Sequence, residues 1–307
     1  MKLNSINNSF NQFLFGNEQA PLKHSFLIFF RISISILALI DILSLQSDWH
    51  AFFGLNGTIV PQQLSYLKSE YFSYLNPFYN QLKHYQLIDI FYKYILITYV
   101  ISLISLAIGF LSRFSAVLCL FLQLIIFRSF PVFNFGYDHF ITMSLFYCFL
   151  FPVGRSFSID TMIFKWRIKK PFSLPYQRIL QIHISIVYFF SGLAKGTDPN
   201  WWNGNAVWRA TASFYTSFYS YPAFIMCIIG TSVVLLELTY PLFVSIKKTR
   251  FYIISGVIMM HCGIAVIMDL HTFAGIMIIW NLTAFYNFDK IYKIRRETPL
   301  INLNAAT

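Results

Sequence analysis

The chain has 307 residues, of which 57% are hydrophobic, 20% aromatic and 11% charged, and its formal net charge is +11. A soluble domain of this length carries about 25% charged residues, so the composition excludes an ordinary soluble protein. Apolar runs that approach the roughly 20 residues needed to cross a bilayer recur along the chain, and they predict a polytopic membrane protein.

The first predicted element is a polar N-terminal segment, residues 1–21. It is rich in Asn and has no basic start, short apolar core or small-residue cleavage site, so we expect no cleaved signal peptide. A membrane domain follows over residues 22–288, and a basic tail occupies residues 289–307. Within the membrane domain we predict an all-α bundle of about eight transmembrane helices. Their expected ranges are 22–45, 90–111, 114–133, 138–153, 178–195, 222–246, 251–268 and 270–288.

The segment between the first two spans, residues 46–89, differs in character from the rest. It is too polar to cross a bilayer, and it is rich in Tyr, Phe and Leu. A turn at Leu55-Asn56-Gly57-Thr58 and two prolines, Pro61 and Pro77, divide it. We therefore expect short helices that lie in the membrane interface and roof the bundle.

Basic residues collect on one side of this eight-span arrangement. They fill the links after spans two, four and six and follow span eight: Arg113, Arg155, Lys165, Arg167, Lys169, Lys170, Arg178, Lys247, Lys248, Arg250, Lys290, Lys293, Arg295 and Arg296. The positive-inside rule then places both termini in the cytoplasm of a multi-pass cell-membrane protein, with residues 46–89 outside. This bias also accounts for the net charge, so the bilayer is the expected partner and nucleic acid is not.

Ionisable side chains inside a bilayer are costly unless they are paired or functional. Arg31 and Asp41 fall in the first span, where we expect them to pair with neighbours and stabilise the bundle. Glu237 and His261 fall within the sixth and seventh spans. Six others lie at or above the outer face, where an outward-opening polar cavity would gather them: Asp138, His139, Lys195, Asp198, Asp269 and His271.

Several kinds of chemistry are not indicated by any motif. The four cysteines fall in apolar spans without a Cys-x-x-Cys pair, which is typical of buried structural thiols. The spacing of histidines and carboxylates matches no compact zinc pattern, so no metal is expected. The sequence has no nucleophile elbow, Walker loop or dinucleotide fingerprint.

Lys195 ends an apolar helix and opens a polar, aromatic loop that contains Asp198, Trp201 and Trp202. An amine at the mouth of a hydrophobic bundle loses hydration of its charged form, which can make it a usable base. A lysine at the end of a span can equally extend its amine to the membrane interface and have no further role. The residues by themselves leave both interpretations open.

Four stretches then point to a family. They are Phe30 to Asp41 with Gly57 to Pro61, Asp138 to Phe140 with Phe151 to Asp160, Gln181 and Tyr188 with Ser191-Gly192-Leu193-Ala194-Lys195 and Trp201 to Ala206, and His261-Cys262-Gly263. In this order the chain resembles the HTTM (horizontally transferred transmembrane) family, the membrane domain shared with vitamin K-dependent gamma-glutamyl carboxylase. Its size is similar to that of the short bacterial members, which include the membrane protein that matures sporulation-delaying peptide toxins.

The resemblance implies a catalytic site. Lys195 would be the base that deprotonates a reduced, vitamin K-type quinone, which reacts with O2. His139 would hydrogen-bond in that reaction, and His261 would also be catalytic. Glu237 would line the cavity, together with Asp138, Asp198, Trp201, Trp202, Asp269 and His271.

Two functions follow as expectations. In the first, the protein is an enzyme, carboxylase-like or using quinol-dependent oxidation, that modifies an exported peptide or a lipid on the extracytoplasmic side. A small secreted peptide precursor and accessory maturation proteins would be its partners. We expect no counterpart of the large domain that grips the propeptide in the carboxylase. In the second, it is a non-catalytic membrane partner that binds a peptide toxin precursor for maturation or export.

Overall fold

The computed structural model describes residues 25–55, 76–128, 135–155, 157–164, 176–212 and 222–286. Throughout these ranges the secondary structure is helical and contains no strand, which confirms the all-α fold. The long helices are α2 (Ser25–Ser44), α5 (Ile88–Ile108), α6 (Ser112–Arg128), α7 (Gly136–Leu150), α9 (Tyr176–Thr197), α12 (Ala223–Ser245), α13 (Arg250–Met268) and α14 (His271–Phe285). The short ones are α3 (Trp49–Phe53), α4 (Asn76–His84), the 3-10 turn η4 (Val153–Arg155), α8 (Ile159–Ile163), α10 (Pro199–Trp202) and α11 (Asn205–Ala212).

Every predicted span coincides with one of the long helices, but their lengths differ. Among the described residues, five helices are long and apolar enough to cross a membrane: α2, α5, α9, α12 and α13. The apolar helices α6 and α14 are shorter, and α7 has 15 residues against the roughly 20 that span a bilayer. A multi-pass membrane protein is therefore confirmed, and the count of eight spans stays a prediction.

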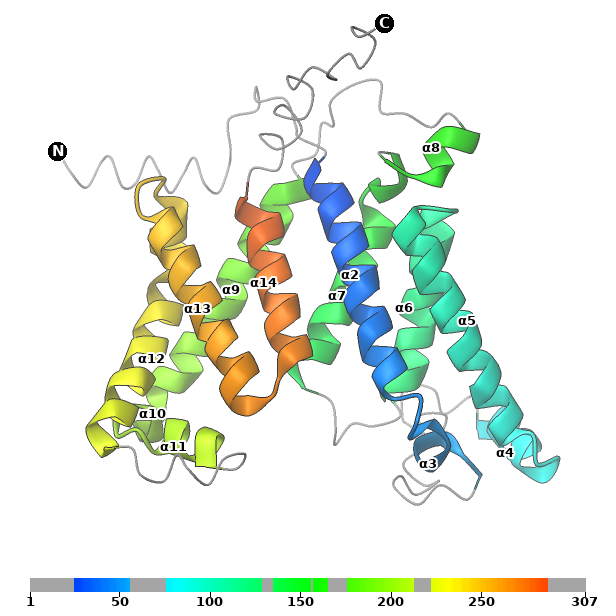
Figure 1. The fold of residues 1–307 in the computed structure, drawn as a ribbon, viewed down its shortest axis with the longest axis horizontal. Coiled ribbons are helices and arrows are strands. Elements are labelled where there is room, and N and C mark those ends of the chain that lie inside the picture. The colour runs from blue at the N-terminus through cyan, green and yellow to red at the C-terminus, as the bar shows by residue number, and fades with distance from the viewer. Residues whose placement is uncertain are drawn as a thin grey trace, which may run out of the picture.

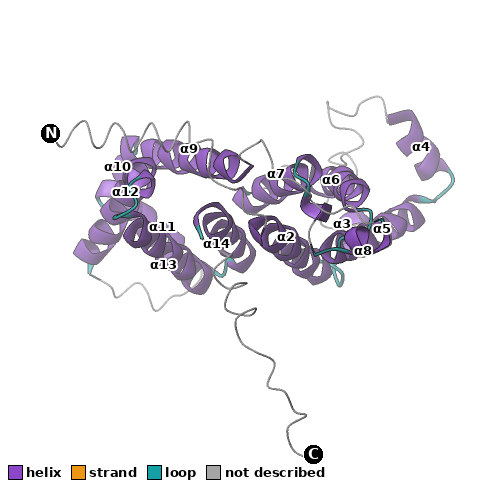
Figure 2. Ribbon diagram, turned by 90° about the horizontal axis from the view of Figure 1, so that it is seen from above, coloured by secondary structure: helices purple, strands orange, loops and turns teal. Residues whose placement is uncertain are grey.

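The long helices stand side by side in two groups (Figure 1). Seen from above, α2, α5, α6 and α7 form one group and α9 to α13 the other (Figure 2). Helix α14 lies between them and contacts α2 and α7 on one side and α9 and α13 on the other. The two groups therefore share one central helix.

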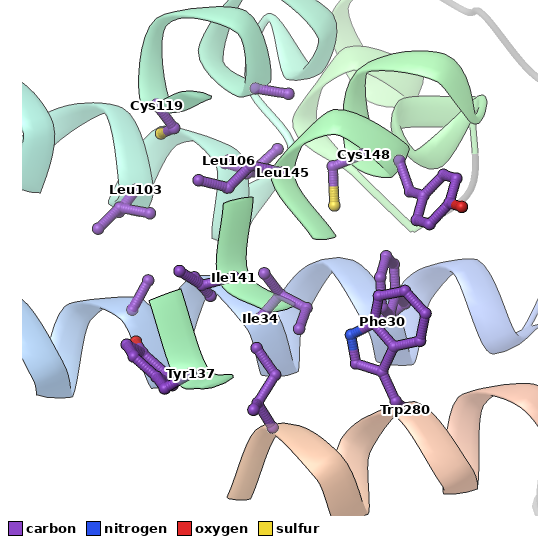
Figure 3. Close-up of a cluster of buried hydrophobic side chains, with 14 of the residues drawn as sticks. Phe30, Ile34, Leu103, Leu106, Cys119, Tyr137, Ile141, Leu145, Cys148 and Trp280 are labelled. Atoms are coloured by element: carbon purple, nitrogen blue, oxygen red, sulfur yellow. The ribbon is translucent and has the colours of Figure 1, made fainter. Parts of the chain in front are cut away.

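The apolar core lies largely in the first group. Figure 3 shows Phe30 and Ile34 of α2 near Trp280 of α14, with side chains of α5, α6 and α7 around them. Cys119 and Cys148 are part of this core, as expected of structural thiols. The expectation is wrong for Cys262, which is exposed because its position on α13 faces away from the bundle.

Arg31 and Asp160 hold together the end of this group that lies at the top of Figure 1. The Arg31 guanidinium is buried and donates to the carbonyls of Val153 at 2.9 Å and Phe157 at 2.6 Å. The Asp160 carboxylate accepts from the backbone N–H groups of Leu111 at 2.7 Å and Ser112 at 2.9 Å, at the start of α6. Arg31 thus pairs with backbone carbonyls of the chain that follows α7, and it contacts no carboxylate of the described residues.

The short helices α3 and α4 lie in the predicted roof segment, at the same end of the bundle as α10 and α11 (Figure 1). The backbone N–H of Leu55, which follows α3, donates to the carboxylate of Asp89 in α5 at 2.8 Å. The centre of the roof segment, residues 1–21, residues 289–307 and most of the basic link after α8 lie outside the described residues. The orientation of the bundle in the membrane stays a prediction.

Candidate functional site

The site begins where α9 and α12 touch. A Cβ atom on Gly192 would lie 2.6 Å from the backbone nitrogen of Leu238 and 3.0 Å from the Cβ of Glu237, so only glycine permits this approach. On α12, Pro241 stands four residues after Glu237 and lacks the N–H that would bond to the Glu237 carbonyl. The two helices therefore meet at backbone distance beside Glu237.

This approach places Lys195 against Glu237. The Lys195 Nζ donates to Glu237 Oε2 at 2.6 Å and to Ser191 Oγ, one turn earlier on α9, at 2.5 Å. The side chains of Lys195 and Glu237 are only 22% and 6% exposed. Of the two interpretations open from the sequence, the structure shows the amine held inside the bundle, in an ion pair.

The loop after Lys195 covers the pair from one side. The Trp201 ring centroid lies 5.3 Å from Lys195 Nζ, within the range of a cation–π contact. Asp198 caps α10, and its Oδ1 accepts from the Asn200 backbone N–H at 2.9 Å. The exposed Trp202 donates from Nε1 to the Gly196 carbonyl at 2.8 Å. Of the three predicted loop residues, Trp201 thus contacts the lysine, and the other two shape the loop.

A second set of polar side chains crosses the interior of the same helix group. Tyr240 of α12 donates from its hydroxyl to Asn281 Oδ1 at 2.7 Å, and Asn281 Nδ2 donates to the Tyr188 oxygen at 2.9 Å. The Tyr188 hydroxyl lies 2.9 Å from His261 Nε2. All four residues are buried, so we call them the buried polar chain.

The ion pair and the buried polar chain are neighbours. Tyr188 and Lys195 are seven residues apart on α9 and Glu237 and Tyr240 three apart on α12, so each helix presents both members on one face. Tyr188, which lies 2.9 Å from His261, is thus on the face of α9 that carries Lys195, about two turns away. Lys195, Glu237 and His261 therefore belong to one site.

The expectation that one cavity gathers every outer ionisable residue is not met. His139 is exposed, because α7 buries Tyr137, Asp138 and Ile141 on its other face. Asp138 Oδ2 accepts from the Phe135 backbone N–H at 2.9 Å, at the start of α7. Helices α7 and α9 meet through the Tyr147 hydroxyl and His183 and diverge toward the ends that carry His139 and Lys195 (Figure 1).

Two other predicted residues also lie apart. Asp269 and His271 form an exposed pair, 3.0 Å between Oδ1 and Nδ1, at the turn between α13 and α14. In the part of the chain that the structure describes, no three histidine, cysteine or acidic side chains are grouped closely enough to hold a metal ion. Asp41, in the other helix group, accepts a hydrogen bond from Tyr137.

Sequence reasoning missed the members of the buried polar chain other than His261. The sequence places Tyr188 in a family motif but indicates no role for it. Asn281 carried a usable signal, because it interrupts the apolar run Ile278-Ile279-Trp280-Asn281-Leu282 and an amide in a span needs partners.

A comparison with models of known families matches the HTTM domain over residues 19–289 of this chain. The match includes all the described helices, and so both the ion pair and the buried polar chain. Neither the comparison with curated proteins nor that with solved structures gives a match.

Proposed function

The chain belongs to the HTTM family, and on that basis we propose that it is a membrane-embedded, vitamin K-dependent carboxylase-like enzyme. Lys195 is its base, a membrane quinol with O2 is its co-substrate, and an exported peptide or a lipid is modified on the extracytoplasmic side. The observation that carries the proposal is the 2.6 Å contact between the Lys195 amine and the Glu237 carboxylate inside the bundle.

The ion pair refines the expected chemistry. Burial by itself favours a neutral amine, but a carboxylate in contact stabilises the ammonium form. Lys195 therefore needs an acceptor for its proton before it can act as a base. Glu237 Oε2 is that acceptor, because it already receives the hydrogen bond from Nζ. When the proton moves to Glu237, the Nζ lone pair is free to accept a proton from a substrate hydroxyl.

The residues present fit a reduced quinone. The amine suits an acidic hydroxyl, the Trp201 ring beside it offers an aromatic face, and His261 has a buried ring nitrogen without a partner among the described residues. A reduced quinone with O2 would supply the oxidising power and the stronger base that these side chains lack. The task of the chain is then to orient the hydroxyl, exclude water and move its proton to Lys195.

Substitution of Lys195 tests the proposal. Lys195→Ala should lower product formation about 10²–10⁴-fold, which is the usual contribution of a positioned base. Lys248→Ala is the matched control, because Lys248 is exposed in the turn between α12 and α13, at the other end of the bundle. The readout is the mass of a co-produced secreted peptide and of the lipid extract, with and without the protein.

The non-catalytic alternative predicts a different pattern. A protein that only binds a peptide precursor should keep its effect in Lys195→Ala and lose it after changes in the roof segment, residues 46–89. Full activity of Lys195→Ala in protein that inserts and accumulates normally would refute the enzyme.

A further inference from the structure

His261 carries a buried polar atom that has no hydrogen-bond partner among the described residues. The residue is 2% exposed, and its Nδ1 makes no hydrogen bond to any described residue. The Phe273 ring packs against the imidazole in an edge-to-face arrangement, with ring centroids 5.7 Å apart. An unpaired polar atom at such depth costs about 1–3 kcal/mol, which favours a partner that the described residues do not supply.

The protonation of this imidazole follows from the direction of the buried polar chain. Asn281 Nδ2 also donates to the Met277 carbonyl at 2.8 Å, and a carbonyl can only accept. The amide is therefore oriented with its nitrogen toward Met277 and Tyr188 and its oxygen toward Tyr240. Consequently Tyr240 donates to Asn281, and Asn281 donates to the Tyr188 oxygen.

The hydroxyl proton of Tyr188 then needs an acceptor. Its oxygen already accepts from Asn281, and among the described residues its remaining partner is His261 Nε2, at 2.9 Å. The Tyr188 hydroxyl must donate to Nε2, so Nε2 carries no proton. A neutral imidazole with a bare Nε2 has its proton on Nδ1. The unpartnered atom of His261 is thus an N–H donor.

We propose that His261 is a hydrogen-bond donor fixed in advance, whose Nδ1–H binds an oxygen of the substrate, the one that becomes negative when Lys195 removes a proton. The ligand class is a phenol, enol or quinone oxygen. Tyr188, Asn281 and Tyr240 are positioning residues that fix the tautomer. This inference rests on the proposed function for its ligand, but the state of the ring can be measured without activity.

Loss of the His261 donor should lower the rate of the proposed reaction. A donor aimed at developing negative charge contributes about 10²–10³ in rate. His139 was the expected partner of that oxygen, and its exposed position leaves the task to His261.

Nitrogen NMR of the full chain, labelled at histidine and held in lipid nanodiscs, reads the ring directly. His261 is assigned among the seven histidines as the signal lost in His261→Asn. The expected result is a protonated Nδ1 and a bare Nε2 in the wild type, and a mixture of tautomers in Tyr188→Phe. A proton on Nε2 in the wild type would overturn the inference.

Adding a short-chain naphthoquinone as the probe tests the ligand. The Nδ1 signal should shift in the wild type, because a quinone carbonyl accepts from it. An Nδ1–H signal that stays constant at saturating probe would overturn the assigned ligand class.

Matched substitutions give the catalytic readout. In His261→Asn the amide nitrogen stands at the place of Nδ1 and keeps a donor there, whereas in His261→Gln it stands at the place of Nε2. We expect His261→Asn to keep at least ten times the activity of His261→Gln. Equal activities, or the reverse order, would contradict the inference. If instead the proposed function is wrong, Lys195→Ala should keep full activity while the His261 tautomer is still the expected one.

Discussion

At the scale of single residues, the site depends on what each polar group touches. Lys195 donates to Glu237 and Ser191, and the Glu237 carboxylate compensates the charge of its ammonium group. His261 has one ring nitrogen engaged and one without a partner among the described residues. In the proposed reaction Lys195 transfers a proton, whereas His261 binds an oxygen.

Removing the charge of Glu237 while keeping its size separates these roles. Glu237→Gln should change the pH dependence of activity, because Lys195 loses both the carboxylate that stabilises its ammonium form and its proton acceptor. Activity should be lost below the pH at which the amine gives up its proton to solvent. Its activity should then rise with pH, since the amine can lose its proton to solvent at high pH. Rate measurements across pH in wild-type and variant membranes check this. Glu237→Asp, which keeps a carboxylate, is the control, and a loss that does not change with pH would argue against proton transfer.

Residue identity also explains what the sequence did and did not reveal. Lys195, Glu237 and His261 stood out because ionisable groups in apolar spans are costly. Tyr188 and Tyr240 did not, because tyrosines are common in such helices. His139 was expected in the cavity because it falls at the outer end of the fourth span. That position does not specify which face of α7 the residue occupies. The period of the apolar positions Tyr137, Ile141 and Leu145 predicts that face, and it directs His139 outward.

At the scale of elements, the pair α9 and α12 holds the ion pair in place. Gly192 brings the backbones together, and Gly196 follows one turn later beside Val234. Small residues four apart allow helices to pack closely in a membrane, where apolar burial gives little drive for association. Gly192, which has no side chain, therefore sets the distance between Lys195 and Glu237.

A methyl group at this crossing should separate the helices. Gly192→Ala places a Cβ 2.6 Å from the Leu238 backbone nitrogen, and we expect a loss of about 1–3 kcal/mol together with a fall in activity. Gly263→Ala, on α13, is the control, since a Cβ there meets no described atom within 4 Å. Melting of the purified proteins in detergent compares them. Equal midpoints for the two variants would show that the close crossing is not required.

Helix positions were predictable because long apolar runs form helices in a membrane protein, and each expected range coincides with a long helix of the structure. The pairing of helices was not, because neither charge bias nor run length specifies neighbours. The exposed Cys262 illustrates the difference, since its helix was expected and its outward face was not.

At the scale of the whole molecule, the two ends of the bundle differ in their chemistry. One end has Arg31 and Asp160 bound to backbone groups, and the other has α3, α4, α10 and α11 (Figure 1). The distribution of lysine and arginine predicts that the end with α10 and α11 faces outward. The loop after Lys195 would then be open to secreted substrates.

Single cysteines test this orientation. In a background with Cys227→Ser and Cys262→Ser, which leaves only the buried Cys119 and Cys148, Asn203→Cys should react with a membrane-impermeant thiol reagent in intact cells, because Asn203 is exposed between α10 and α11. Lys248→Cys should react only after the cells are opened. The reverse pattern would place Lys195 near the cytosol and remove the exported substrate from the proposed function.

Helix α14 joins the two helix groups through adjacent residues. Trp280 donates from Nε1 to Ser144 Oγ at 2.8 Å and packs on Phe30, in the first group. Asn281, the next residue, holds Tyr188 and Tyr240 in the second. Any rotation of α14 about its own axis would break both sets of contacts at once. Two adjacent residues thus fix the rotation of α14 from both sides. The hydrogen bond that Asn281 donates to Tyr188, beside His261, therefore depends on how Trp280 packs in the first helix group.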